Sequence, residues 1–311
     1  MTLLIPLLLA AQQPGISLEP EIAATVALTE GPAADAQGNL YFSETNSARI
    51  FKLTLDGQLT VFRENSNNAN GLAFDAQGRL VACEGSNGVR RQPRVTRTDM
   101  RTGAIEVLAD KYQGKPFNSP NDVVIDAKGR IYFTDPAFST PRPEQVGANG
   151  VYRIDPDGKL TRLLATPEIQ RPNGVMISPD DRTLYLVEAN RDPGGARMIR
   201  AYDLQPDGSV RNMRVFHNFF PGRSADGLCV DVAGNLYAVA GLNRPRGTTE
   251  TLDTQAGVHV FSPQGKKLRF LPVGEDLVTN CAFGGADRKT LFVTAGKTLY
   301  RFRVGSEGTS R

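Results

Sequence analysis

The stretch "RPNGVMISPDDRTLYLVEAN" (171–190) returns in modified form as "SADGLCVDVAGNLYAVA" (224–240). In both stretches an Asn or Asp precedes a Gly and stands five residues ahead of a turn. Related segments bring the number of copies to six, with turn positions at Asp35, Asp75, Asp126, Ser178, Asp231 and Gly285. These positions are 40, 51, 52, 53 and 54 residues apart, which defines a repeating unit of about 50 residues.

Each unit is predicted to contain four short antiparallel strands. The first two flank an Asp-x-x-Gly type of turn, in which the Asp side chain caps its own backbone and Gly accepts a positive φ. A second hairpin follows, as in "VYRIDPDGKLTRLL" (151–164), where apolar and polar residues alternate about a Gly-bearing turn. Helical periodicity is absent from these segments, so the sequence predicts an all-β protein.

The sixth unit lacks an outer strand, because only "SEGTSR" follows "TLYRFRVG" (298–305). The segment "LEPEIAATVAL" (18–28) precedes the first unit and is the expected donor of the missing strand. Such a closure removes the exposed sheet edges that favour aggregation. We therefore predict one six-bladed β-propeller domain over residues 18–311, with four antiparallel strands per blade and a ring closed by an N-terminal strand.

Composition excludes several classes of protein and site. The chain has 311 residues with 36 Lys+Arg, 33 Asp+Glu and a net charge of +3, which argues against a nucleic-acid partner. The segment "RRQPRVTRTDMR" (90–101) is interpreted as a solvated strand pair. Three dispersed cysteines (83, 229 and 281) and two histidines (217 and 259) argue against a zinc site and predict buried free thiols.

The N-terminal segment "MTLLIPLLLAAQQPG" is apolar but too short to span a bilayer. Residues 1–17 are interpreted as a leader segment. If residues 1–11 act as an export signal, the protein is periplasmic or secreted, and otherwise it is cytoplasmic. No membrane span is expected.

In a propeller, equivalent positions of the innermost strands form a ring around the central channel. The residues five places ahead of each turn all bear side-chain oxygens: Glu30, Asn70, Asn121, Asn173, Asp226 and Asn280. Capping of each strand is one interpretation, although it explains poorly why a Glu occurs and no Ser or Thr. The other is a hard cation, because carboxylate and amide oxygens suit Ca²⁺ and two carboxylates in a narrow channel would otherwise repel each other.

The sequence resembles the family of six-bladed propellers that includes senescence marker protein (regucalcin), gluconolactonase and diisopropyl fluorophosphatase. The segments that resemble it are "TEGPAADAQGNLYFSE", "SPNDVVIDAKGRIYFTDP", "RPNGVMISPDDRTLYLVEAN" and "ADGLCVDVAGNLY". The resemblance implies that Glu30, Asn121, Asn173 and Asp226 bind one divalent cation, usually Ca²⁺, with Mn²⁺, Zn²⁺ or Mg²⁺ as substitutes. It also implies that Asp226 is the catalytic acid or base.

Two departures from that family concern substrate contacts. Here "CEGSNGVRRQPR" (83–94) lacks the His that follows Cys-Glu in gluconolactonase-like members, and Ser119 replaces an arginine of regucalcin-type members. We expect substrate contacts from Asn70, Asn118, Lys115 and Arg197.

The leading functional hypothesis is Ca²⁺-dependent hydrolysis of a small sugar lactone, with Asp226 handling the proton of the attacking water. A phosphotriesterase-type hydrolase at the same metal site and a non-catalytic calcium-binding propeller remain alternatives. No Ser/His/Asp arrangement competes, since His217 and His259 lack a Gly-x-Ser-x-Gly partner. The expected partner is a small-molecule lactone, and the protein is expected to be a monomer or a small homo-oligomer.

Overall fold

The structure, a computed structural model, describes residues 15–85, 92–138, 141–143 and 145–309. The leader assignment, and part of the segment around residues 83–94, therefore concern residues outside the described ranges. In the described part of the chain, strands form six four-stranded antiparallel sheets and one small two-stranded sheet. None of the described segments is a helix of the length and apolarity needed to cross a membrane.

The sheets follow one another along the chain, and each of the first five begins with its innermost strand. The first two sheets contain β2 (Thr29–Ala34), β3 (Leu40–Glu44), β4 (Arg49–Leu53) and β5 (Leu59–Arg63), then β6 (Ala69–Phe74), β7 (Leu80–Glu84), β8 (Arg94–Thr98) and β9 (Ile105–Ala109). The third and fourth contain β12 (Val123–Ile125), β13 (Ile131–Asp135), β14 (Gly150–Ile154) and β15 (Leu160–Ala165), then β16 (Pro172–Ile177), β17 (Thr183–Ala189), β18 (Arg197–Leu204) and β19 (Val210–Asn218). The fifth contains β20 (Ala225–Val230), β21 (Leu236–Ala240), β22 (Gly257–Phe261) and β23 (Lys267–Pro272).

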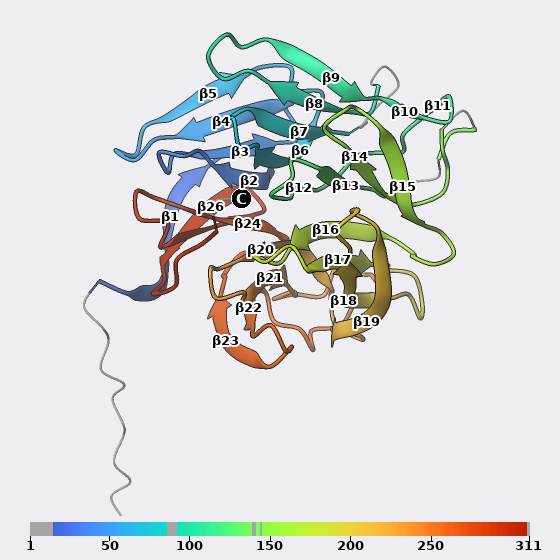
Figure 1. The fold of residues 1–311 in the computed structure, drawn as a ribbon. Helices are drawn as coiled ribbons and strands as arrows, with labels where there is room; N and C mark the ends of the chain where they lie inside the picture. The colour runs from blue at the N-terminus through green and yellow to red at the C-terminus, as the bar shows by residue number, and fades with distance from the viewer. Residues whose placement is uncertain (1–14, 86–91, 139–140, 144, 310–311) are drawn as a thin grey trace, which may run out of the picture.

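The sixth sheet closes the ring. It consists of β24 (Val278–Gly284), β25 (Thr290–Ala295), β26 (Thr298–Arg303) and, on its outer edge, the N-terminal strand β1 (Ser17–Thr25). Figure 1 shows blue β1 lying beside red β26, and the two strands pair in antiparallel fashion. The predicted closure and the six-bladed fold are therefore confirmed.

The inner strands form a closed ring, since β2 contacts β6 and β24, and β12, β16 and β20 contact their neighbours in turn. Hydrophobic clusters lie between successive sheets. One of them joins the first sheet to the sixth through Leu40 and Phe42 on one side and Phe292 and Leu299 on the other. Burial of these interfaces holds the blades together and fixes the positions of the inner strands. The three cysteines are buried and free, as predicted.

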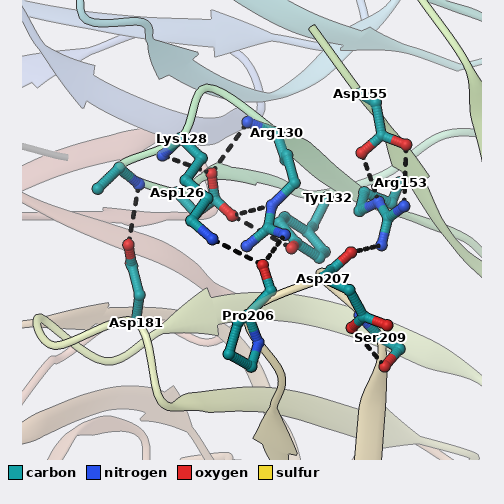
Figure 2. A network of polar contacts seen from close by, with 11 residues as sticks. Asp126, Lys128, Arg130, Tyr132, Arg153, Asp155, Asp181, Pro206, Asp207 and Ser209 are labelled. Carbon is teal, nitrogen blue, oxygen red and sulfur yellow. Dashed lines mark hydrogen bonds and ion pairs between the residues drawn. The ribbon is translucent and has the colours of Figure 1, made fainter.

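The turns at the far end of the inner strands have the predicted Asp caps. Asp126 Oδ1 accepts hydrogen bonds from the backbone N–H groups of Lys128 and Arg130, both at 2.9 Å. Figure 2 shows how this turn is tied to the neighbouring blade, where Arg130 Nη1 donates to the Pro206 carbonyl at 3.0 Å. Arg153 likewise donates to the Asp207 carbonyl at 2.8 Å. These contacts cross-link the third and fourth blades at that end of the channel.

One small element was not predicted from the sequence. Strands β10 (Lys111–Tyr112) and β11 (Lys115–Pro116) form a hairpin between the second and third blades. It lies outside the repeat, so self-similarity gave no signal for it.

Candidate metal-binding and active site

The recurring polar residues stand at irregularities of the inner strands. In β2 the pairing with β3 shifts register between Glu30 and Ala33, and β20 shifts in the same way between Ala225 and Leu228. Similar shifts occur at the start of β6, β16 and β24. A β-bulge changes the direction in which a side chain points and commonly occurs beside functional sites. In five of the six described blades the sequence pattern thus marks a bulge beside the polar residue, whereas β12 pairs with β13 without a register shift.

The Gly that follows several of these residues is required by close packing between blades. A Cβ atom on Gly31 would lie 2.0 Å from the Asn70 carbonyl oxygen, and one on Gly174 would lie 2.3 Å from the Asp226 carbonyl oxygen. Gly71 and Gly227 meet the next blade in the same manner. The Gly after each of these polar residues therefore allows adjacent ring residues to approach one another.

Asp122 replaces this Gly in the third blade, and the sequence analysis did not identify it as a site residue. Its carboxylate accepts hydrogen bonds from the Val175 backbone N–H at 3.1 Å and from Asn280 Nδ2 at 3.3 Å. Asn280 belongs to the sixth blade, so this contact joins opposite sides of the ring. Burial raises the pKa of Asp122 to about 7, and the charge of Asp226 contributes to the rise. The signal in the sequence was the break in the Asn-Gly pattern.

The carboxylates of Glu30 and Asp226 lie close enough to interact. Burial raises the pKa of Glu30 well above its ordinary value, and the negative charge of Asp226 is the next largest cause, ahead of that of Asp122. Burial also raises the pKa of Asp226. Like charges in a buried site destabilise the ionised forms of both groups. This end of the channel therefore favours either protons or a cation.

Asp226 has two neighbours that favour its ionised form. Arg223 Nη2 donates to Asp226 Oδ2 at 3.0 Å, and only 5% of the Arg223 side chain is exposed. The Asn173 side chain is also hydrogen-bonded to Asp226. The positive charge of Arg223 opposes the effect of burial on the pKa of Asp226. Arg223 was not identified from the sequence because it lies in the loop after β19, where the repeat gives no alignment.

The donor set fits a hard cation. Glu30 and Asp226 offer carboxylates, while Asn173 lies against Asp226 and Asn121 stands two residues before β12 at the same end of the ring. Oxygen ligands of mixed charge are those that Ca²⁺ prefers. Within residues 15–85, 92–138, 141–143 and 145–309, no group of three or more His, Cys, Asp or Glu side chains is arranged to hold a metal ion. A site here would therefore depend on the Asn amide oxygens.

The predicted substrate-contact residues lie in different environments. Asn70 is the second residue of the inner strand β6, and Lys115 is exposed on β11. Asn118 is buried, and its Nδ2 donates to the Ala148 carbonyl at 2.9 Å while its Oδ1 accepts from the Gly147 N–H at 3.0 Å. Arg197 is 1% exposed and donates to backbone carbonyls of three loops. The structure thus brings Asn70 into the ring, whereas Asn118 and Arg197 organise loops around it.

Asp135 supports the loop that precedes Asn121 and gives a pH-dependent prediction. Its buried carboxylate accepts the backbone N–H groups of Asn118 and Ser119 at 2.9 and 2.6 Å. Burial raises its pKa to about 7, although these hydrogen bonds lower it. The folded protein thus keeps a proton that the unfolded chain releases between about pH 4 and 7. The stability that this proton contributes is fully present below the pKa that Asp135 has in the unfolded chain. It is lost as the pH rises through the pKa that Asp135 has in the folded protein.

We expect Asp135→Asn to remove this pH dependence. Between pH 5 and 7 the wild type should lose about 2 kcal/mol of unfolding free energy relative to the variant. Guanidinium unfolding at several pH values measures it. The exposed Asp157→Asn serves as the control and should follow the wild type. A difference that is independent of pH would contradict the prediction.

Comparison with known proteins identifies the family. Residues 28–297 match the family described as SMP-30/Gluconolactonase/LRE-like region. The chain belongs to this family. A gluconolactonase from Zymomonas mobilis subsp. mobilis is 30% identical over 316 residues, covering 92% of this chain and 81% of that protein. The resemblance inferred from the sequence motifs is therefore confirmed.

Solved structures of the SMP-30/Gluconolactonase/LRE-like family have the same fold. The structure of a gluconolactonase from Xanthomonas campestris superposes with a TM-score of 0.74 at 32% identity, covering 92% of this chain and 88% of that one. A calcium-binding regucalcin from Agrobacterium tumefaciens superposes with a TM-score of 0.71 at 20% identity, over 95% of each chain. At that lower identity the likeness concerns the fold alone.

Proposed function

We propose that this protein hydrolyses a small sugar lactone with one bound Ca²⁺ as cofactor. The observation that supports this most strongly is the approach of the Glu30 and Asp226 carboxylates in a buried channel, with Asn173 hydrogen-bonded to Asp226. Gluconolactonases are among the relatives that share the sequence and the fold.

Glu30, Asn121, Asn173 and Asp226 would hold the cation. When bound, it would polarise the lactone carbonyl and stabilise negative charge on that oxygen. Asp226 is the proposed general base, because Arg223 favours its ionised form and the carboxylate lies in the ring. It accepts a proton from the attacking water and returns it to the ring oxygen as the ester bond breaks. The product is the open-chain hydroxy acid.

A lactone panel tests the proposal. The purified protein should open aldonolactones such as D-glucono-1,5-lactone above the spontaneous rate, as measured by proton release with a pH indicator. A chelator should abolish the enzymatic rate, and added Ca²⁺ should restore it. A folded protein that opens no lactone with Ca²⁺, Mn²⁺, Zn²⁺ or Mg²⁺ would refute the proposed function.

A further inference from the structure

Three loops at the Asp226 side of the ring are tied together by Arg197. Its Nη1 donates to the Pro221 carbonyl at 2.7 Å and to the Thr249 carbonyl at 3.0 Å, and its Nε donates to the Asn190 carbonyl at 3.2 Å. The Thr251 N–H adds a bond to the Pro221 carbonyl at 3.1 Å. The loops after β17, β19 and β21 thus form a single wall, which we call the arginine wall after the side chains described below.

The arginine wall presents three further guanidinium groups: Arg191, Arg223 and Arg246, one from each loop. Arg223 is buried against Asp226, whereas Arg191 is 45% exposed and its Nε lies 3.8 Å from Glu250 Oε1. Burial lowers the pKa of Arg223 most, and the positive charges of Arg191 and Arg246 lower it further. The charge of Arg191 also opposes the rise that burial causes in the pKa of Asp226. The three guanidinium groups are therefore close enough to affect one another and the proposed base.

The charges around Arg223 do not balance. The charged groups with the largest effects on Arg223 are Asp226, Glu250, Arg191 and Arg246, so three guanidinium groups face two carboxylates. One positive charge is left over. Positive charges held together in a partly desolvated site favour a bound anion.

We infer that the substrate is a lactone bearing a carboxylate, and that Arg191 and Arg246 bind this carboxylate beside the reacting ester. This inference rests on the proposed lactone hydrolysis and specifies its substrate class. A single negative charge matches the excess, and guanidinium groups recognise carboxylates through paired N–H donors. Arg223 already donates to Asp226, so it acts as a positioning residue, and the more exposed Arg191 and Arg246 are the groups available to the substrate.

Two substrates with a common carbon skeleton test the inference. D-Glucaro-1,4-lactone carries a carboxylate, whereas D-glucono-1,4-lactone is neutral. With Ca²⁺-loaded protein at pH 7 and low salt, kcat/KM for the charged lactone should exceed that for the neutral one by about tenfold or more. This ratio should fall by about tenfold in Arg191→Gln and in Arg246→Gln. The ratio of the two kcat/KM values should also fall at 0.5 M NaCl, about three times the physiological salt concentration, because salt screens the attraction between the guanidinium groups and the carboxylate.

The control is Arg182→Gln, a side chain that is 85% exposed in the turn at the other end of the inner strands. Its ratio should equal that of the wild type. A wild-type ratio near one, or a ratio unchanged in both wall variants, would overturn the inference while leaving lactone hydrolysis intact. Faster hydrolysis of a phosphorylated gluconolactone than of the carboxylate substrate would overturn the choice of carboxylate. Failure to open either lactone would overturn both the inference and the proposed function.

Discussion

Replacing Asp226 by Asn is expected to lower kcat/KM for lactone hydrolysis by about a thousandfold, within the range typical for removal of a general base. The Asn amide retains an oxygen for a cation but cannot accept a proton from water. Assays at saturating Ca²⁺ therefore separate the loss of the base from weaker ion binding. The measurement is the initial rate of proton release, with circular dichroism to confirm that the variant is folded.

The same substitution removes the ionic partner of Arg223. Because that guanidinium is buried, we expect a loss of about 1 to 3 kcal/mol in unfolding free energy, so the assay temperature should stay well below the midpoint of unfolding. Asp157→Asn, in an exposed turn, is the matched control and should retain full activity. If Asp226→Asn kept more than about a tenth of the wild-type kcat/KM, the assignment of Asp226 as the base would be wrong, since such bases contribute far more.

The fold could be predicted because its signal is repeated. A turn motif that recurs six times, each time after an inner-strand pattern, aligns the blades without any knowledge of their packing. The unmatched strand at residues 18–28 followed from the same count, and β1 occupies the predicted position beside β26. The Asp caps at the turns were also predictable, because a side chain that bonds to its own backbone is determined locally.

The polar residues of the ring could be predicted from the same alignment of repeats, whereas the residues in the loops around the ring could not. Glu30 and Asp226 occupy equivalent positions of the repeat, and the bulges place them at one end of the channel. Arg223 and Arg197 lie in or beside loops that differ from blade to blade. Arg197 joins residues near 190, 221 and 249, a grouping that depends on tertiary structure alone. Sequence reasoning therefore predicted Arg197 as a substrate contact on residue type, without access to its burial.

Asp122 illustrates a different limit. The alignment drew attention to what the repeats share, and Asp122 matters because it departs from them. It stands where four other blades have Gly, so its carboxylate is the one that extends toward Val175 and Asn280. Packing between blades restricts this position to Gly elsewhere in the ring, so a side chain here indicates that the neighbouring blade leaves room for it.

Glu30→Gln is expected to have opposite effects on stability with and without Ca²⁺. In a chelator, the variant should be more stable than the wild type by roughly 1 to 2 kcal/mol, because burial and the charge of Asp226 both destabilise the ionised Glu30 carboxylate. With Ca²⁺ at a hundred times the wild-type Kd, the wild type should gain about 2.7 kcal/mol. If loss of one carboxylate ligand weakens binding about a hundredfold, the variant should gain only about 0.4 kcal/mol.

Denaturant unfolding in EDTA and in Ca²⁺ measures both effects, and titration calorimetry gives the affinities directly. Glu168→Gln, an exposed glutamate, is the control and should follow the wild type in each condition. The two signs separate the competing explanations. If Glu30 only capped its strand, Glu30→Gln would be less stable than the wild type in EDTA, and the gain in stability from Ca²⁺ would be the same in both proteins. That pair of results would exclude Glu30 as a ligand. A crossover of the two stability curves on adding Ca²⁺ requires that the repulsion between the carboxylates be relieved by the ion itself.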